Sequence, residues 1–347
     1  MNESKWFING MMPAKIMHRH LILILFLIIP LLTSSSVMAQ SVKSKNKKEK
    51  NKTWAEQLGF PKGKKVLLLH MDDIGMCPEA NEAAERYIKN NHILSAAVMM
   101  PCPNATSFIE WAKSHPSADI GLHLTLTSEW KNYRWPPLTD AAKVPSLIDP
   151  DGKFWHEVPD VVAHASAKEV EMEIRAQIEK CLALGYRPTH IDTHMGTLIG
   201  SPEYVKVFFK VAEEYGIPAN VIDITVPEGA TQFRQKEYPV NDDVINTVAK
   251  YKLPKLDDFT YVHEGSTYED KRTKFFTMVK SLNPGLTEIY FHPSVLTDNL
   301  KTITNSWQQR VWEADLFADP VVHQFFKKEG IVITNWKEVM KRFGEKK

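Results

Sequence analysis

The sequence predicts an α/β fold in which parallel strands are arranged as a barrel, within a single domain. From residue 64 onward, short apolar runs alternate with stretches of helical period, and about eight such units follow one another. Strands that alternate with helices pair in parallel through right-handed crossovers. The polar candidate residues described below fall where predicted strands end, as catalytic residues do in barrels of this kind. The sequence has no visible internal repeat or second-domain boundary.

The predicted strands are short apolar runs, and the predicted helices are amphipathic stretches between them. The strands cover residues 65–71, 93–100, 120–126, 189–194, 220–224, 259–263, 288–292 and 331–334. The helices cover residues 79–90, 107–115, 167–184, 202–215, 244–250, 270–282, 308–317 and about 336–342. In the third helix, Val170, Ile174 and Ile178 recur every four residues on one face, and charged residues occupy the other. The long insert at residues 127–161 is expected to overhang the carboxyl end of the barrel.

The N-terminal segment has the features of a signal peptide, predicted over residues 1–39. A basic stretch precedes an apolar run at residues 21–32, and Val37-Met38-Ala39 fits a cleavage site. The apolar run is shorter than the roughly 20 residues that a membrane-spanning helix needs. We therefore expect an exported protein, periplasmic or secreted, without stable membrane insertion after cleavage. An uncleaved N-terminal anchor is the alternative.

A lysine-rich stretch over residues 40–53 is expected to be a flexible basic tether, and residues 54–347 to form the catalytic domain. The whole chain carries a net charge of +1, but many of its lysines lie in the tether, so the remaining body is acidic overall. An acidic body argues against nucleic-acid binding. The three cysteines, Cys77, Cys102 and Cys181, form no disulfide framework. Pairing of Cys77 with Cys102 stays open.

Two adjacent carboxylates, Asp72 and Asp73, end the apolar run at residues 66–71. Two carboxylates so close together oppose each other's ionisation unless a cation or a proton lies between them. His123 and His194 end two further predicted strands, so one carboxylate and two imidazoles can form a metal site with open positions. Zn²⁺, Mn²⁺, Fe²⁺, Co²⁺ or Mg²⁺ fits such a set. Asp72 neighbours a ligand but is expected to point elsewhere on the pleat, where it can act as a base.

Three more polar residues accompany this set. His292 ends another predicted strand and could protonate a leaving nitrogen or stabilise an oxyanion. Asp192 is expected to face away from His190 and His194, and to orient His190 or a neighbouring loop. Each residue alone has a structural explanation, such as a helix cap for the Asp pair or a core position for His123. Their joint occurrence at strand ends favours a metal-dependent hydrolase.

Four motifs, taken together and in this order, resemble the YdjC-like carbohydrate deacetylases, a family that includes chitooligosaccharide deacetylases. They are His-Met-Asp-Asp-Ile-Gly-Met-Cys-Pro-Glu-Ala-Asn (70–81), Gly-Leu-His-Leu-Thr-Leu-Thr (121–127), Pro-Thr-His-Ile-Asp-Thr-His (188–194) and Phe-His-Pro-Ser (291–294). The resemblance extends from about residue 64 to 340. It implies a distorted TIM-like (β/α) barrel, a divalent metal ion (Mg²⁺ or Zn²⁺) and hydrolysis of an N-acetyl group on a sugar. It also implies that Asp73, His123 and His194 are metal ligands, Asp72 the base and His292 the second catalytic group.

The chain departs from the family pattern at three places. His70-Met71 precedes the Asp pair and Ile74 follows it, where the family usually has Asn-Ala and Phe. Met195-Gly196-Thr197 stands where further histidines are common, and no arginine is evident at Ala219-Asn220. These departures are expected to affect the substrate side more than the metal side.

The leading hypothesis is an exported metal-dependent enzyme that removes N-acetyl groups from an amino-sugar-containing carbohydrate, which would be its partner. One alternative is a hydrolase of the same scaffold that cuts another bond, a phosphoester or a non-sugar amide. Another is a non-catalytic glycan-binding protein, although such a protein needs no second carboxylate at Asp72. The sugar, the native metal and the oligomeric state are left open by the sequence.

Overall fold

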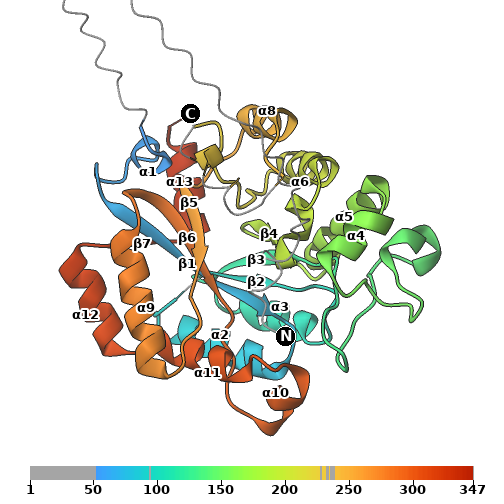
Figure 1. Cartoon of the computed structure of the whole chain (residues 1–347), viewed down its shortest axis with the longest axis horizontal. Coiled ribbons are helices and arrows are strands. Elements are labelled where there is room, and N and C mark those ends of the chain that lie inside the picture. Colours follow the sequence, from blue (N-terminus) through green and yellow to red (C-terminus); the bar gives the residue numbers. More distant parts are fainter. Residues whose placement is uncertain (1–51, 94, 227–228, 232–233, 235–238, 347) are drawn as a thin grey trace, which may run out of the picture. The chain divides into compact units, whose positions relative to one another are not determined.

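The strands form one parallel sheet that curls into a distorted barrel (Figure 1). The computed structural model describes residues 52–346 except 94, 227–228, 232–233 and 235–238. The chain divides into two units, Met1–Asn51 and Lys52–Lys347. The predicted signal peptide and all but the last two residues of the predicted tether lie outside the described residues, so both stay predictions. None of the described helices combines the length and apolar character needed to cross a membrane.

The described residues contain a seven-stranded sheet with the order β4-β3-β2-β1-β6-β5, and β7 also pairs with β1. Its strands are β1 (Lys65–Ile74), β2 (Ser95–Val98), β3 (Asp119–Leu124), β4 (Ile191–Thr193), β5 (Asp258–Tyr261), β6 (Gly285–Phe291) and β7 (Val332–Thr334). Strand β7 pairs with the first half of β1, and β2 pairs with its second half. On the other edge, β6 pairs with β1 along most of the length of β1. The predicted single-domain barrel is confirmed.

The prediction of a strand at residues 220–224 is wrong, because tight turns replace the backbone hydrogen bonds that a strand would make with its neighbours. Val221 N–H bonds to the carbonyl of Ala219, and Ile224 N–H bonds to that of Ile222, each across only two residues. Single parallel bridges remain, from Ile191 to Ala219 and from Ile222 to Leu256. These bridges connect β4 with the segment that leads into β5, and they close the distorted side of the barrel.

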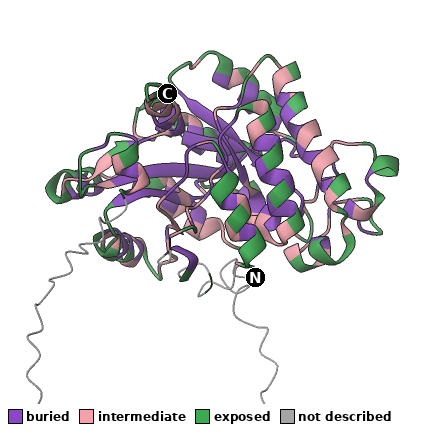
Figure 2. Ribbon diagram, turned by 90° about the horizontal axis from the view of Figure 1, so that it is seen from above, coloured by how far each residue is buried: buried purple, intermediate pink, exposed green. Residues whose placement is uncertain are grey.

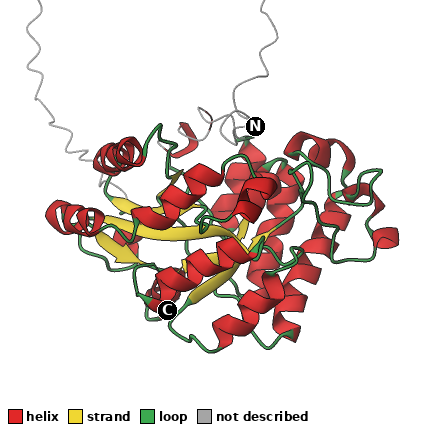
Figure 3. Cartoon of the chain, turned by 90° about the horizontal axis from the view of Figure 1, so that it is seen from below, coloured by secondary structure: helices red, strands yellow, loops and turns green. Residues whose placement is uncertain are grey.

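The predicted helices all form, with ends shifted by a few residues. They are α2 (Pro78–Lys89), α3 (Ala105–Lys113), α5 (Ala167–Ala183), α6 (Pro202–Tyr215), α8 (Asp242–Lys250), α9 (Tyr268–Ser281), α11 (Trp307–Leu316) and α13 (Trp336–Gly344). Among the helices fully described in the structure, four α-helices were not predicted: α1 (Trp54–Gln57), α4 (Val158–His164), α10 (Asp298–Ile303) and α12 (Pro320–Glu329). Figure 3 shows the helices packed around the sheet.

The interior of the barrel is apolar at one end and polar at the other. Val66 and Leu68 pack with Trp336 of α13, which closes the amino-terminal end. Since alternate residues of a strand share a face, His70 lies on the same side of β1, one step nearer the carboxyl end. Leu67 and Leu69 face the larger outer core under the helices. Strands β1, β2 and β3 are almost fully buried, whereas β5 is partly buried and Ile333 of β7 is exposed. Exposed residues gather on the outer faces of the helices (Figure 2).

The structure shows that Cys77 and Cys102 do not form a disulfide. Cys77, Cys102 and Cys181 are free thiols, and all three are buried. Burial also raises the pKa of the Cys77 thiol to about 12, so the thiol stays protonated and inert at neutral pH.

Candidate metal centre and active site

A bulge in β1 brings both adjacent carboxylates to one place. The pairing of β1 with β2 shifts in register between Met71 and Ile74, and Asp73 adopts a left-handed backbone conformation with φ 60°. Asp73 Oδ1 lies 3.5 Å from Nε2 of His123, and Asp72 Oδ2 lies 3.9 Å from the same nitrogen. The expectation that Asp72 points elsewhere on the pleat is therefore wrong, because the bulge removes the alternation at this position.

The residues predicted as ligands do converge. Asp73, His123 and His194 each offer one atom, and these three atoms lie within 4.8 Å of one another, with all three residues buried. Asp73 Oδ1 is 3.5 Å from Nε2 of His123 and 3.2 Å from Nδ1 of His194. This oxygen accepts no hydrogen bond from the described residues. Ligand atoms at about 2.0–2.2 Å from one cation are roughly 3–3.5 Å apart, so the set fits a divalent metal ion.

Each of the two imidazoles is backed by a carboxylate on its other nitrogen. Nδ1 of His123 donates to Asp192 Oδ1 at 2.6 Å, and Nε2 of His194 donates to Glu129 Oε2 at 3.1 Å. Such outer carboxylates fix the tautomer and the ring orientation of a metal-ligating histidine. With these protons committed, Nε2 of His123 and Nδ1 of His194 are left as acceptors, and both face Asp73.

The predicted orientation of Asp192 is wrong. Positions 190, 192 and 194 are separated by two residues each, so a strand puts them on one face rather than on alternate faces. Asp192 accordingly points into the barrel and bonds His123 and His70, not His190. His190 instead contacts Thr189 Oγ1 at 2.9 Å through Nδ1.

Arg310, a buried residue of α11, orients the Asp73 carboxylate. Its Nη2 donates to Asp73 Oδ2 at 2.8 Å, which leaves Oδ1 facing the two histidines. Burial opposes ionisation of Asp73, but the positive charge of the neighbouring Arg310 guanidinium is the largest opposing cause, and the pKa of this carboxyl lies well below its usual range. Asp73 is therefore an anion at neutral pH, as a metal ligand must be.

Asp72 has a different environment from its neighbour. Burial raises the pKa of its carboxyl well above the usual value, and the positive charge that His123 carries when protonated opposes this shift. Its Oδ1 lies 3.4 Å from Nε2 of His70. His70 was expected to affect the substrate side, but it is fully buried behind Asp72. This departure from the family pattern therefore touches the candidate base.

His292 lies on the other side of Asp73 and is the most accessible of the predicted site residues. About 21% of its side chain is exposed, and its Nε2 is 4.0 Å from Asp73 Oδ2. Its backbone N–H donates to Glu313 Oε2 at 2.6 Å. Glu313 is in turn held by the buried Lys271, whose Nζ donates to Oε1 at 2.7 Å. The loop that carries His292 is thus fixed by a buried ion pair.

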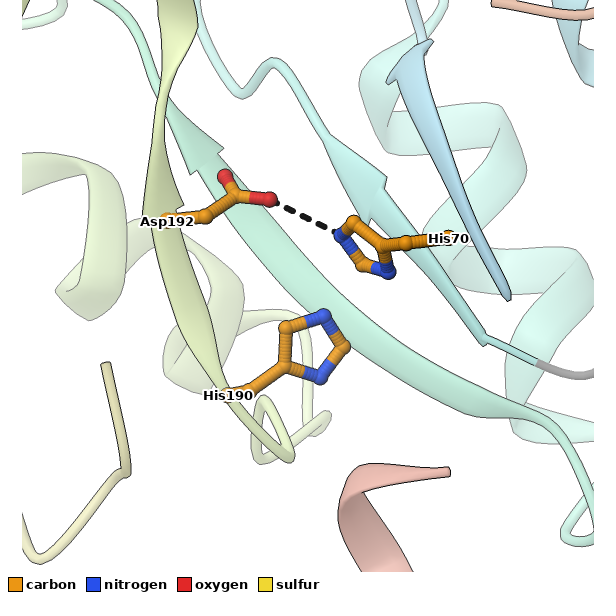
Figure 4. A group of neighbouring side chains, drawn as sticks. All are labelled: His70, His190 and Asp192. Carbon is orange, nitrogen blue, oxygen red and sulfur yellow. Dashed lines mark hydrogen bonds and ion pairs between the residues drawn. The ribbon is translucent and has the colours of Figure 1, made fainter. Parts of the chain in front are cut away.

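A second group of possible ligands, His70, His190 and Asp192, lies deeper in the barrel (Figure 4). Its fit to a metal is poorer. His70 and Asp192 are already hydrogen-bonded to each other at 2.8 Å. The imidazole of His190 packs on Gly121, where an added Cβ would lie only 2.4 Å from Nε2. Asp73, His123 and His194 are therefore the better candidate centre.

The insert at residues 127–161 contributes to the site, as expected. It supplies Glu129, the partner of His194, and Trp135, whose ring centroid is 6.5 Å from that of His194. Trp130 packs edge-on against Trp135, and the guanidinium of Arg310 lies 5.6 Å from its ring centroid. Neither Glu129 nor Arg310 was identified from the sequence. Glu129 follows the motif at residues 121–127 by two positions, which was the one available signal.

A curled parallel barrel with one carboxylate and two imidazoles gathered at its strand ends defines a class of α/β-barrel proteins with a site suited to a metal ion. The model of the family described as YdjC-like protein matches residues 66–328, so this chain belongs to the YdjC-like family. The predicted resemblance is confirmed.

Relatives and a solved structure agree with this assignment. The chain is 30% identical over 268 residues to a carbohydrate deacetylase of Thermus thermophilus, covering 76% of this chain and 89% of the relative. It is 27% identical over 274 residues to a carbohydrate deacetylase of Thermoanaerobacter pseudethanolicus, covering 78% and 98%. A candidate cellobiose-phosphate cleavage protein of Enterococcus faecalis shares the fold, with a TM-score of 0.65, 22% identity and coverage of 80% and 99%.

Proposed function

We propose that this chain is an exported, metal-dependent deacetylase that hydrolyses the N-acetyl group of an amino-sugar-containing carbohydrate. Two relatives named carbohydrate deacetylase, matched over most of their length, support the reaction class. The observation that carries the proposal is the pairing of a complete candidate ligand set with a second carboxylate, Asp72, beside it. A binding protein has no use for that second buried carboxylate.

Asp73, His123 and His194 would hold the metal ion, for which Mg²⁺ and Zn²⁺ are the candidates. Two imidazole nitrogens suit Zn²⁺, and the carboxylate suits either ion. When bound, such an ion lowers the pKa of a water molecule and polarises a carbonyl oxygen. Asp192, Glu129 and Arg310 hold the three ligands in place.

The chain's own residues can carry both proton transfers of amide hydrolysis. Asp72 accepts a proton from the attacking water as its oxygen bonds to the acetyl carbon. His292, on the more open side, donates a proton to the sugar nitrogen as the C–N bond breaks. The products are acetate and a free amino sugar. Because burial raises the pKa of Asp72, its ionised carboxylate accepts a proton more readily than that of an exposed aspartate.

Export rests on the N-terminal sequence alone. The basic stretch, the apolar run at residues 21–32 and the Val37-Met38-Ala39 site support cleavage after residue 39 and delivery to the periplasm or the medium. Intact mass and N-terminal sequencing of the protein recovered outside the cytoplasm test this. A mature chain beginning at Gln40 is expected, whereas a full-length chain in the membrane fraction would establish the anchor instead.

Acetate release from a panel of N-acetylated mono- and oligosaccharides tests the enzymatic proposal. The purified protein is assayed after chelation, with Mg²⁺ or Zn²⁺ restored, and as the His194→Ala variant. His190→Ala is the matched control, because His190 is another buried histidine on the same strand segment but outside the candidate ligand set. Metal-dependent acetate release that His194→Ala abolishes is expected. Bound metal without acetate release would favour cleavage of another bond, and absence of both would refute the enzyme.

A further inference from the structure

His70 occupies the space between two carboxylates of the site. Its Nε2 lies 2.8 Å from Asp192 Oδ2 and 3.4 Å from Asp72 Oδ1 (Figure 4 shows the contact with Asp192). Its Nδ1 lies 3.0 Å from Ser95 Oγ. The residue is fully buried. Contacts at both ring nitrogens and the lack of solvent fix the orientation of the imidazole.

Asp192 connects His70 to the candidate metal centre. One carboxylate oxygen of Asp192 receives His70 Nε2–H, and the other receives Nδ1–H of His123 at 2.6 Å. A single imidazole edge therefore contacts both the candidate base, Asp72, and the carboxylate that orients a candidate ligand. Neither of these contacts involves a residue that would bind the metal directly.

Asp72 depends on this contact because it has few others. Its Oδ1 accepts no hydrogen bond from the described residues, and its Oδ2 lies 3.9 Å from Nε2 of His123. In the proposed function, Nε2 of His123 binds the metal and carries no proton to share with Asp72. Among the described residues, His70 is then the partner that holds the Asp72 carboxylate, across 3.4 Å, on the side of the attacking water.

We propose that His70 is a positioning residue for deacetylation, which holds the Asp72 carboxylate in its reactive orientation by bridging it to Asp192. The proposal rests on the proposed function of Asp72 as the base. It predicts that removal of the imidazole slows the chemical step without affecting metal retention, because Asp73, His123 and His194 keep their own supports in Asp192, Glu129 and Arg310.

Two substitutions at His70 and one at a neighbour test the proposal. His70→Leu removes the donor, whereas His70→Gln places an amide N–H near the position of Nε2. His190→Leu is the matched control. The ring centroid of His190 lies 4.7 Å from that of His70 and the residue is equally buried, but the described structure records no hydrogen bond or ion pair between His190 and Asp72. Metal content, kcat and KM for acetate release, and crystal structures of the three variants are measured.

For His70→Leu, we expect kcat to fall by about 10- to 100-fold, as for loss of other outer-sphere supports, with KM and metal content within about threefold of the unmodified protein. His70→Gln is expected to recover most of kcat, and His190→Leu to keep it. An unchanged kcat in His70→Leu, or equal losses in His70→Leu and His190→Leu, would overturn the proposal, as would failure of His70→Gln to rescue.

The crystal structures separate this proposal from the proposed function. If the unmodified protein released no acetate from any sugar, the proposed function would fail, but the positioning role would still be tested. The Asp72 carboxylate should then turn away from the site in His70→Leu and keep its place in His190→Leu. An Asp72 carboxylate that does not move in His70→Leu would refute the role of His70 whatever the reaction is.

Discussion

Asp72 and Asp73 are neighbours in one strand, but both carboxylates approach the same atom, Nε2 of His123, at 3.9 and 3.5 Å. A regular strand would send the two side chains to opposite faces. The bulge in β1 and the left-handed conformation of Asp73 remove that alternation. Backbone strain of about 1–3 kcal/mol is the usual cost of such a conformation. In this chain the left-handed conformation of Asp73 brings a candidate ligand, Asp73, and a candidate base, Asp72, to the same side of the His123 imidazole.

Substitution of each Asp separately should distinguish the two roles. Asp72→Asn is expected to lower kcat by about 10²- to 10⁴-fold, the usual contribution of a general base, while the metal stays bound. Asp73→Asn is expected to lose metal, because a neutral amide oxygen replaces an anionic ligand beside Arg310. Acetate assays together with metal analysis by mass spectrometry check both. Loss of metal in Asp72→Asn would show that the assignments are reversed.

Glu129→Gln tests the carboxylate behind His194. Without the anionic acceptor at 3.1 Å, the imidazole loses its preferred tautomer and part of its basicity. Metal affinity is expected to fall by about 10- to 100-fold, as measured by competition with a chelator of known affinity.

Glu157→Gln is the control for that substitution. Glu157 is a half-buried carboxyl near Glu129, and burial together with repulsion from Glu129 raises its pKa to about 7. It has no contact with His194 among those recorded in the structure, so metal affinity should stay within about twofold. An equal loss in both variants would mean that general charge, rather than the bond to His194, controls affinity.

The site was predictable where it follows strand ends and was not predictable where it depends on long-range contacts. Asp73, His123 and His194 end strands that the apolar runs define, so their convergence follows from parallel topology. Arg310 reaches Asp73 across 237 residues of chain, and nothing in its own helix marks it as a site residue. Asp192 was misassigned for a simpler reason, since the two-residue spacing to His190 and His194 requires a shared face.

Part of the fold also escaped prediction. Residues 220–224 are rich enough in Val and Ile to suggest a strand, but two local turns use the backbone groups that a ladder needs. Helix α12 was also missed, although it carries strong end signals: Asp319 caps its start, Pro320 lies in its first turn and Gly330 follows its end.

Gly75→Ala should destabilise the protein and loosen the bulge that presents the Asp pair. Gly75 has φ 89°, and an added Cβ would lie 2.8 Å from the Cα of Ala105 and 3.0 Å from Cγ1 of Val98. Gly63→Ala is the matched control, because Gly63 also has a positive φ, 71°, but open space around it. The free energy of unfolding of Gly75→Ala should be lower than that of Gly63→Ala by about 1–3 kcal/mol, the cost of overpacking. Equal values from urea denaturation would exclude the steric explanation.

Glu288, a buried residue of β6, should make stability fall as the pH rises towards neutrality. Burial raises the pKa of Glu288 to about 7, and repulsion from Asp192 adds to this, although His70 opposes it. In the unfolded chain the carboxyl titrates near its usual value of about 4.5, so between about pH 4.5 and 7 the folded state binds the extra proton. The contribution of this group to the free energy of unfolding is therefore fully present below about pH 4.5, and it is lost as the pH rises through about 7.

Glu288→Gln removes that titration and should flatten the profile. The amide oxygen can still accept the bond from Trp336 Nε1, which is 3.0 Å from Glu288 Oε2. Urea unfolding of metal-free protein at pH 5 and at pH 8 gives the comparison. Between these values, the unmodified protein should lose about 2.5 kcal/mol more than Glu288→Gln, since about two pH units separate pH 5 from the folded pKa and each unit corresponds to about 1.4 kcal/mol. Glu82→Gln, at an exposed position of α2, should keep the slope of the unmodified protein. Parallel profiles for the unmodified protein and Glu288→Gln would show that Glu288 stays ionised inside the barrel, neutralised by His70.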